Sequence, residues 1–127
     1  MEFTRLFTDD DGETQFETVM LEASAIPGGT ENVPTINMTI RSSPRLTAGE
    51  ELHNCPRRQF VLVLSATMEI ETSRGESRRF QPGDLLFVED LEGRGHRLRH
   101  LGGEEIRIML LPVGDGWACH AGQRARI

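Results

Sequence analysis

The 127-residue sequence has no lysine, no tyrosine, one tryptophan and only two cysteines. Its fourteen basic residues are therefore all arginines, and twenty acidic residues leave a net charge of −6. This balance argues against a nucleic-acid-binding protein that works by neutralising phosphates. Cys55 and Cys119 lie far apart in the sequence; one disulfide between them is possible but would not be a framework, and we expect both thiols to be reduced.

Long apolar runs are also missing, and none approaches the roughly 20 residues that span a bilayer. The N-terminus lacks the basic stretch, the apolar stretch and the small-residue cleavage site of a secretory signal. We therefore expect a cytoplasmic protein that binds neither membranes nor nucleic acid. The length suits one domain with its own core, and 37% hydrophobic residues are too many for a disordered chain.

No segment of ten or more residues keeps the 3.6-residue repeat of a helix. Short segments of alternating polarity dominate instead, and Gly, Pro, Asp or Ser ends each of them. Nearly continuous apolar runs predict central strands that are buried on both faces. Many short strands around one core predict an all-β sandwich or barrel. The predicted strands are 3–7, 15–21, 35–41 (Ile36, Met38 and Ile40 on one face), 59–64, 67–72, 84–88 and 105–111.

The side chains that could carry chemistry are concentrated in two segments. His53, Cys55 and Gln59 stand at even spacings, so an extended chain presents them on one face. Residues two apart in a strand lie about 6–7 Å apart at Cα, which lets their side chains reach one ion. His96 and His100 are about 13 Å apart in an extended strand, too far to share an ion.

The first of these segments resembles the first motif of the cupins, a family of small β-barrels. That motif runs G-x5-H-x-H-x3,4-E-x6-G, and this chain reads His53-x-Cys55-x3-Gln59-x6-Ala66. Cysteine stands where the family has its second histidine, and glutamine stands where it has glutamate.

The second segment resembles the second cupin motif, G-x5-P-x-G-x2-H-x3-N. It opens at Gly83, reaches His96 over a longer interval than the family pattern, and has His100 at the Asn position. The resemblance covers about 49–112. The stretches 56–65 and 80–96 are similar to a subgroup of small single-domain bacterial cupins.

The resemblance implies a single-domain cupin-like double-stranded β-helix, a jelly-roll barrel, over residues 1–127. We expect the core barrel at about 35–112, N-terminal strands at 3–22 and an irregular C-terminal tail at 113–127. The resemblance also implies a homodimer. Strands 3–7 and 15–21 lie outside the barrel motifs and need a partner edge, which favours the same assembly.

The matching motif positions imply that His53, Gln59 and His96 hold a divalent transition metal (Fe, Ni, Mn or Zn) with positions open for substrate. Cys55 has two interpretations. It is a soft ligand if it is a thiolate, and a small buried hydrophobe if it is a thiol. Because the glutamate is lost, the alternative is a polar pocket that no longer binds metal tightly.

Arg57 and His100 are the candidate substrate-binding residues. Arg57 and Arg58 alternate in facing, so one of them can point into the barrel mouth, where it suits a carboxylate or phosphate. The alternative is a solvated arginine at the edge. We expect His100 to be a pocket or core histidine rather than a metal ligand.

Two functions remain open from the sequence. One is a metal-dependent enzyme (isomerase, lyase or dioxygenase type) that acts on a small organic metabolite in the barrel. The other is a non-catalytic small-molecule binding or sensing protein with a vestigial metal site. The fold alone cannot choose between them, and no catalytic residue can be named.

Overall fold

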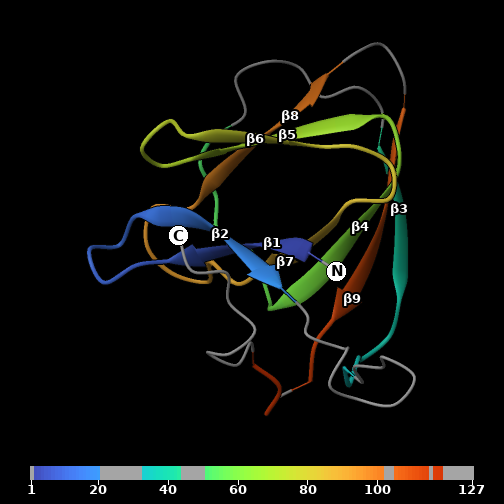
Figure 1. Ribbon diagram of the computed structural model, residues 1–127, viewed down its shortest axis with the longest axis horizontal. Helices are drawn as coiled ribbons and strands as arrows, with labels where there is room; N and C mark the ends of the chain where they lie inside the picture. The colour runs from blue at the N-terminus through green and yellow to red at the C-terminus, as the bar shows by residue number, and fades with distance from the viewer. Residues whose placement is uncertain (1, 21–32, 44–50, 102–104, 115, 119–127) are drawn as a thin grey trace.

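A computed structural model describes residues 2–20, 33–43, 51–101, 105–114 and 116–118. These residues form strands and loops without a helix, and so hold no helix that could cross a membrane. The strands (Figure 1) are β1 (Glu2–Thr8), β2 (Thr14–Met20), β3 (Thr39–Ser43), β4 (Gln59–Ser65), β5 (Thr67–Thr72), β6 (Ser77–Phe80), β7 (Leu85–Val88), β8 (His96–Leu101) and β9 (Ile106–Pro112).

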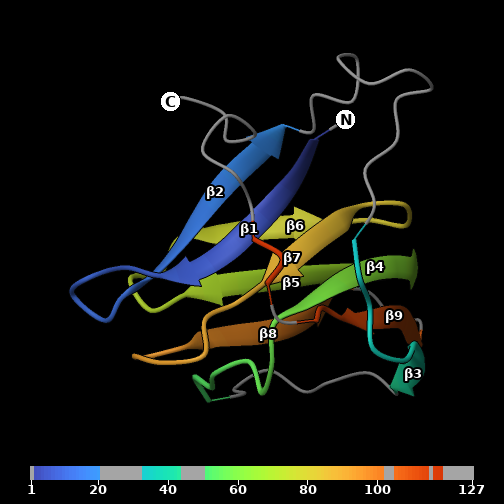
Figure 2. The ribbon, with the colours of Figure 1, turned by 90° about the horizontal axis from the view of Figure 1, so that it is seen from below.

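The strands form two sheets that face each other (Figures 1 and 2). The larger sheet has six strands in the order β2-β1-β7-β4-β9-β3, and the smaller has three in the order β6-β5-β8. All neighbours are antiparallel except β1 and β7, which are parallel. The predicted all-β class and the two-sheet barrel implied by the cupin resemblance are confirmed.

Alternating side chains fill the space between the sheets. Met68 and Ile70 of β5 are 2% and 3% exposed, whereas Glu69 and Glu71, which alternate with them, point outward to arginines. The buried set continues across β7 and β4 of the facing sheet. The predicted strands over 59–64, 67–72, 84–88 and 105–111 agree with the structure within one residue at each end.

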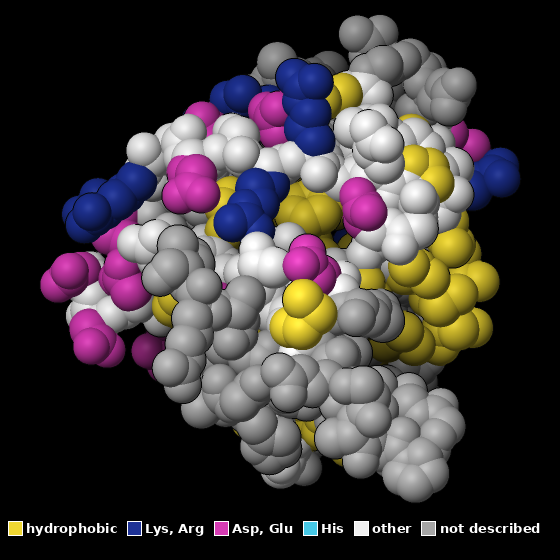
Figure 3. Space-filling view, in the orientation of Figure 1, with side chains coloured by type: hydrophobic (Ala, Val, Ile, Leu, Met, Phe, Trp, Pro, Cys, Tyr) yellow, Lys and Arg dark blue, Asp and Glu magenta, His cyan; other side chains and the backbone are white. Residues whose placement is uncertain are grey.

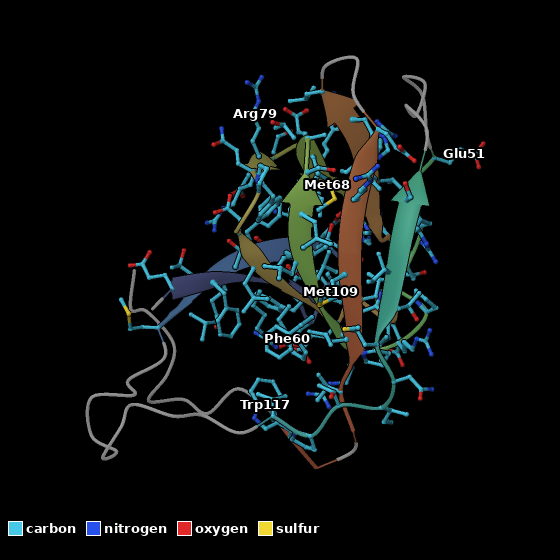
Figure 4. All side chains as sticks on the ribbon, turned by 90° about the vertical axis from the view of Figure 1, so that its right-hand side faces the viewer. Glu51, Phe60, Met68, Arg79, Met109 and Trp117 are labelled. Atoms are coloured by element: carbon cyan, nitrogen blue, oxygen red, sulfur yellow. The ribbon has the colours of Figure 1, made fainter. Side chains whose placement is uncertain are left out.

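A second apolar cluster covers the outer face of the larger sheet. Phe60 of β4 packs edge-on against Phe3 at 5.3 Å between ring centroids, and lies 4.8 Å from Phe87 of β7. Trp117 follows β9 in the chain and lies over both Phe60 and Phe87 (Figure 4). This layer buries β4 and β7 on both faces, as their continuous apolar sequences predict, and it anchors the described part of the tail.

Strand β3 differs from its prediction. Asn37 has a φ of +62°, which interrupts the extended chain, so the strand begins at Thr39 instead of residue 35. The face shared by Ile36, Met38 and Ile40 points outward, with exposed fractions of 56%, 55% and 59%. Figure 3 shows hydrophobic side chains gathered on this side of the molecule. The neighbouring residue Arg41 is also exposed, but it lies at the rim of a cavity between the sheets.

The expectation that the strand over 3–7 lacks a partner edge is wrong. β1 pairs in parallel with β7 of the same chain, with Thr4 opposite Leu86. The free edge lies one strand further out, at β2, which pairs with β1. Cys119 and most of the predicted tail lie outside the described residues.

Candidate functional site

The two motif segments meet at His53 and His96. These residues form an antiparallel bridge in which each backbone N–H donates to the carbonyl of the other at 2.9 Å. Their imidazole ring centroids are 4.6 Å apart. Gly95 makes this approach possible, because a Cβ there would lie 2.3 Å from the carbonyl oxygen of His53. The predicted convergence of the two histidines is therefore present.

Both imidazoles have one nitrogen engaged. Nδ1 of His96 lies 2.5 Å from Oδ2 of Asp90, a fully buried carboxylate. Nδ1 of His53 lies 3.2 Å from the carbonyl oxygen of Glu51. Since a carboxylate and a carbonyl only accept hydrogen bonds, each Nδ1 donates its proton. The lone pair of each ring is then on Nε2, which is the arrangement seen in metal-binding histidines.

Gln59 begins β4 and is 8% exposed. Its Nε2 donates to Sγ of Cys55 at 3.7 Å, but its Oε1 is buried without a hydrogen-bond partner among the described residues. A buried amide oxygen is normally paired, so an unpaired one in a cavity wall indicates a missing water, ion or ligand.

Cys55 belongs to the wall rather than to the donor set. It is 5% exposed, and its thiol donates to the carbonyl oxygen of Arg57 at 2.6 Å. Burial raises the pKa of this thiol to about 11. Because this thiol is buried and is hydrogen-bonded to the backbone of Arg57, the structure favours the interpretation of Cys55 as a small buried hydrophobe.

These side chains surround a cavity of about 140 Å³ between the sheets. Gln59 and His96 are buried in it, whereas Arg41, His53 and Arg57 are exposed and form its rim. The other described side chains that line it are mostly apolar: Cys55, Pro56, Val61, Met68, Ile70, Leu86, Val88, Leu98, Ile108 and Leu110.

The structure separates the remaining candidates. Arg57 lines the cavity, whereas Arg58 turns outward, pairs with Glu89 at 3.3 Å and donates to the carbonyl oxygen of Trp117 at 2.7 Å. His100 pairs with Met68 across β8 and β5 and is half-buried, but it is not among the described side chains that line the cavity.

Sequence reasoning missed Asp90 and Arg41. Asp90 falls in a predicted loop, and no spacing rule connects it to His96. Arg41 offered one signal, because it is the only charged residue in the alternating segment 35–41.

The side chains that line the cavity can supply three metal ligands only if the amide oxygen of Gln59 is counted as one of them. No group of three His, Cys, Asp or Glu among the described residues could hold an ion. Nε2 of His53, Nε2 of His96 and Oε1 of Gln59 are the three candidate donors among the residues that line this cavity. All three are neutral, so the site lacks the negative charge that a carboxylate would bring.

Comparison with known proteins adds little beyond the fold. No family model and no curated protein matches the chain. Among solved structures, protein NMB1881 from Neisseria meningitidis matches at 12% identity and a TM-score of 0.47, covering 75% of this chain and 99% of that one. The dTDP-4-dehydrorhamnose 3,5-epimerase of Bacillus anthracis matches at 15% identity and a TM-score of 0.39, covering 97% of this chain and 74% of its own.

Likenesses this distant say nothing about activity or ligand. The fold assignment comes from the chain itself, through its sheet order and the meeting of two motif segments. The protein has a cupin-like two-sheet β-barrel with His53, Gln59 and His96 on one internal cavity.

Proposed function

We propose that the protein binds a small organic molecule in the cavity between its sheets, beside a divalent transition metal (Fe, Ni, Mn or Zn) held by His53, Gln59 and His96. The observation that carries the proposal is the buried, unpaired Oε1 of Gln59. Leaving such an oxygen without a partner costs about 1–3 kcal/mol. A ligand that accepts its lone pair removes that cost.

The chain's own residues prepare the site. Asp90 holds the His96 ring in one tautomer and orientation, and the backbone bridge holds His53 beside it. Apolar walls from both sheets limit the access of water. A metal held there would polarise a substrate oxygen, which suits isomerase or lyase chemistry, and only a redox-active metal such as Fe would suit a dioxygenase.

A second candidate is a non-catalytic binding or sensing protein with a vestigial metal site. Two observations favour it: the donor set contains no carboxylate, and Cys55 is a thiol. Neither affects the cavity, so ligand binding is common to both candidates.

Metal content separates the two. We expect the purified protein, refilled with Fe, Ni, Mn or Zn and then desalted, to keep about one equivalent of one of these metals by elemental analysis. Gln59→Ala and His96→Ala should lose it. His100→Ala is the matched control, because it removes an imidazole outside the cavity lining. A wild-type protein that keeps no metal but still binds a ligand supports the second candidate.

We also propose that the protein is a homodimer. Ile36, Met38 and Ile40 form an exposed apolar row beside β3, the edge strand of the larger sheet. A two-fold axis can pair such an edge with its copy, which makes the contact self-complementary.

A further inference from the structure

Two arginines face the cavity without a carboxylate. Arg41 and Arg57 both line it, and none of the other described lining residues is Asp or Glu. Neither guanidinium makes an ion pair with a described carboxylate. Most of the other described arginines are ion-paired; Arg97 and Arg99, for example, both reach Glu71 at 3.1 Å. In a chain of net charge −6, the rim of this cavity is locally positive.

Separate parts of the fold bring these two arginines to the same cavity. Arg41 lies on β3 opposite Ile108 of β9, which also lines the cavity. Arg57 precedes β4, and its carbonyl oxygen accepts the hydrogen bond of the Cys55 thiol. Both arginines are exposed and neither pairs with a described carboxylate, so each can take the anionic group of a ligand. The planar guanidinium is also the group best shaped for a carboxylate or phosphate.

Behind the rim the cavity is apolar. Val61, Leu86 and Leu110 come from the larger sheet, and Ile70 and Leu98 from the smaller. The volume of about 140 Å³ is close to that of an engineered apolar cavity that takes one benzene molecule, roughly 150 Å³. An occupant therefore has about six apolar heavy atoms inside the barrel.

We infer that the ligand is a small monocarboxylic acid, with a compact apolar body between the sheets and its carboxylate at Arg41 and Arg57. The inference rests on the proposed function in one respect, that this cavity is the ligand site. It does not depend on the metal.

The test uses the full chain in chelator, so that metal binding is absent. Benzoate is the probe, benzamide is its uncharged match, and a series from acetate to hexanoate varies the apolar body. We expect benzoate to raise the melting temperature and to bind at least tenfold more tightly than benzamide by calorimetry. Added NaCl should weaken benzoate binding, because the rim is exposed.

Two variants test whether Arg41 and Arg57 bind the carboxylate of benzoate. Arg41→Ala and Arg57→Ala should each weaken benzoate binding at least tenfold and leave benzamide binding unchanged. Arg107→Ala is the control, because Arg107 is an exposed arginine of β9 that pairs with Glu105 outside the cavity. It should bind benzoate as the wild type does.

Three results would overturn the inference: equal affinity for benzoate and benzamide, unchanged benzoate binding in the Arg41→Ala, Arg57→Ala double variant, or no binding by any acid of the series. The metal-refilling experiment is independent of all three. If the protein retains metal but binds no acid, the monocarboxylate inference is wrong and the metal site stands. If it binds the acid but retains no metal, the monocarboxylate inference stands and the metal site is wrong.

Discussion

Nδ1 of His96 lies 2.5 Å from Oδ2 of Asp90, which has no exposed surface. This contact fixes which ring nitrogen can meet a metal. Asp90→Asn can present its amide N–H to Nδ1, and the ring proton then moves to Nε2. We expect metal affinity to fall about 10–100-fold, measured by competition with a chelating dye. Asp10→Asn, in the exposed β1–β2 turn, is the control. Equal affinity in Asp90→Asn and wild type would show that Asp90 has no part in the site.

Gln59→Glu tests the missing negative charge. A carboxylate at this position should raise affinity for Mn or Zn at least tenfold, because the present donors are all neutral. Without metal the same variant should melt at a lower temperature than wild type, since a buried carboxylate is costly. Relative to wild type, the melting temperature of Gln59→Glu should therefore be lower without metal and higher with metal. A variant that melts alike in both conditions contradicts the placement of Gln59.

Cys55 predicts a loss of stability at high pH. Burial raises the pKa of this thiol from 9.0 to about 11, so the folded state holds its proton more tightly than the unfolded state. The contribution to stability is complete below pH 9 and is lost as pH rises from 9 to about 11. Urea unfolding at pH 8 and 10.5 measures it. Cys55→Ala should show a smaller fall over this range, and an equal fall in both proteins would refute the burial argument.

Gly95→Ala tests the contact between the two motif segments. Gly95 has a φ of +80°, and an added Cβ would lie 2.3 Å from the carbonyl oxygen of His53. Gly75 has a φ of +87° with nothing within 4 Å of an added Cβ, so Gly75→Ala carries the backbone strain alone. We expect Gly75→Ala to cost about 1 kcal/mol of unfolding free energy and Gly95→Ala clearly more. Gly95→Ala should also lose metal, and equal costs for the two variants would argue against a tight crossing.

Ile40→Glu tests the proposed homodimer. Ile40 is 59% exposed on the edge strand β3, where a charge opposes pairing with a second copy. Light scattering should give a dimer for the wild type and a monomer for the variant. Leu91→Glu, at a 43% exposed loop position, should stay dimeric. A wild type that is monomeric at all concentrations refutes the proposal.

Much of the fold follows from local sequence. Alternation in β5 and continuous apolar runs in β4 and β7 predicted both the strands and their burial. β3 was harder to predict, because its alternation shows that two faces differ but not which one faces the core. At the edge of this sheet the apolar face of Ile40 points outward, and the charged Arg41 lies at the exposed rim of the cavity.

Only those residues of the candidate site that match the two motifs could be predicted from the sequence. His53, Gln59 and His96 were placed on one cavity by that resemblance, and the structure brings them together. Asp90 was out of reach, because its contact with His96 depends on how a loop folds back. The parallel pairing of β1 with β7 was missed for the same reason, since no local pattern specifies a partner 82 positions away (Thr4 to Leu86).

That pairing orders the events of folding. When the chain is synthesised from its N-terminus, β1 emerges first and has no neighbour except the β2 hairpin until β7 has followed. The part of the larger sheet that contains β1 and β2 (Figure 1) therefore joins the rest only after β4, β5 and β6 have been synthesised, because β7 follows them in the chain. Until then Phe3 and Leu6 of β1 lack the β7 side chains that bury them in the folded protein.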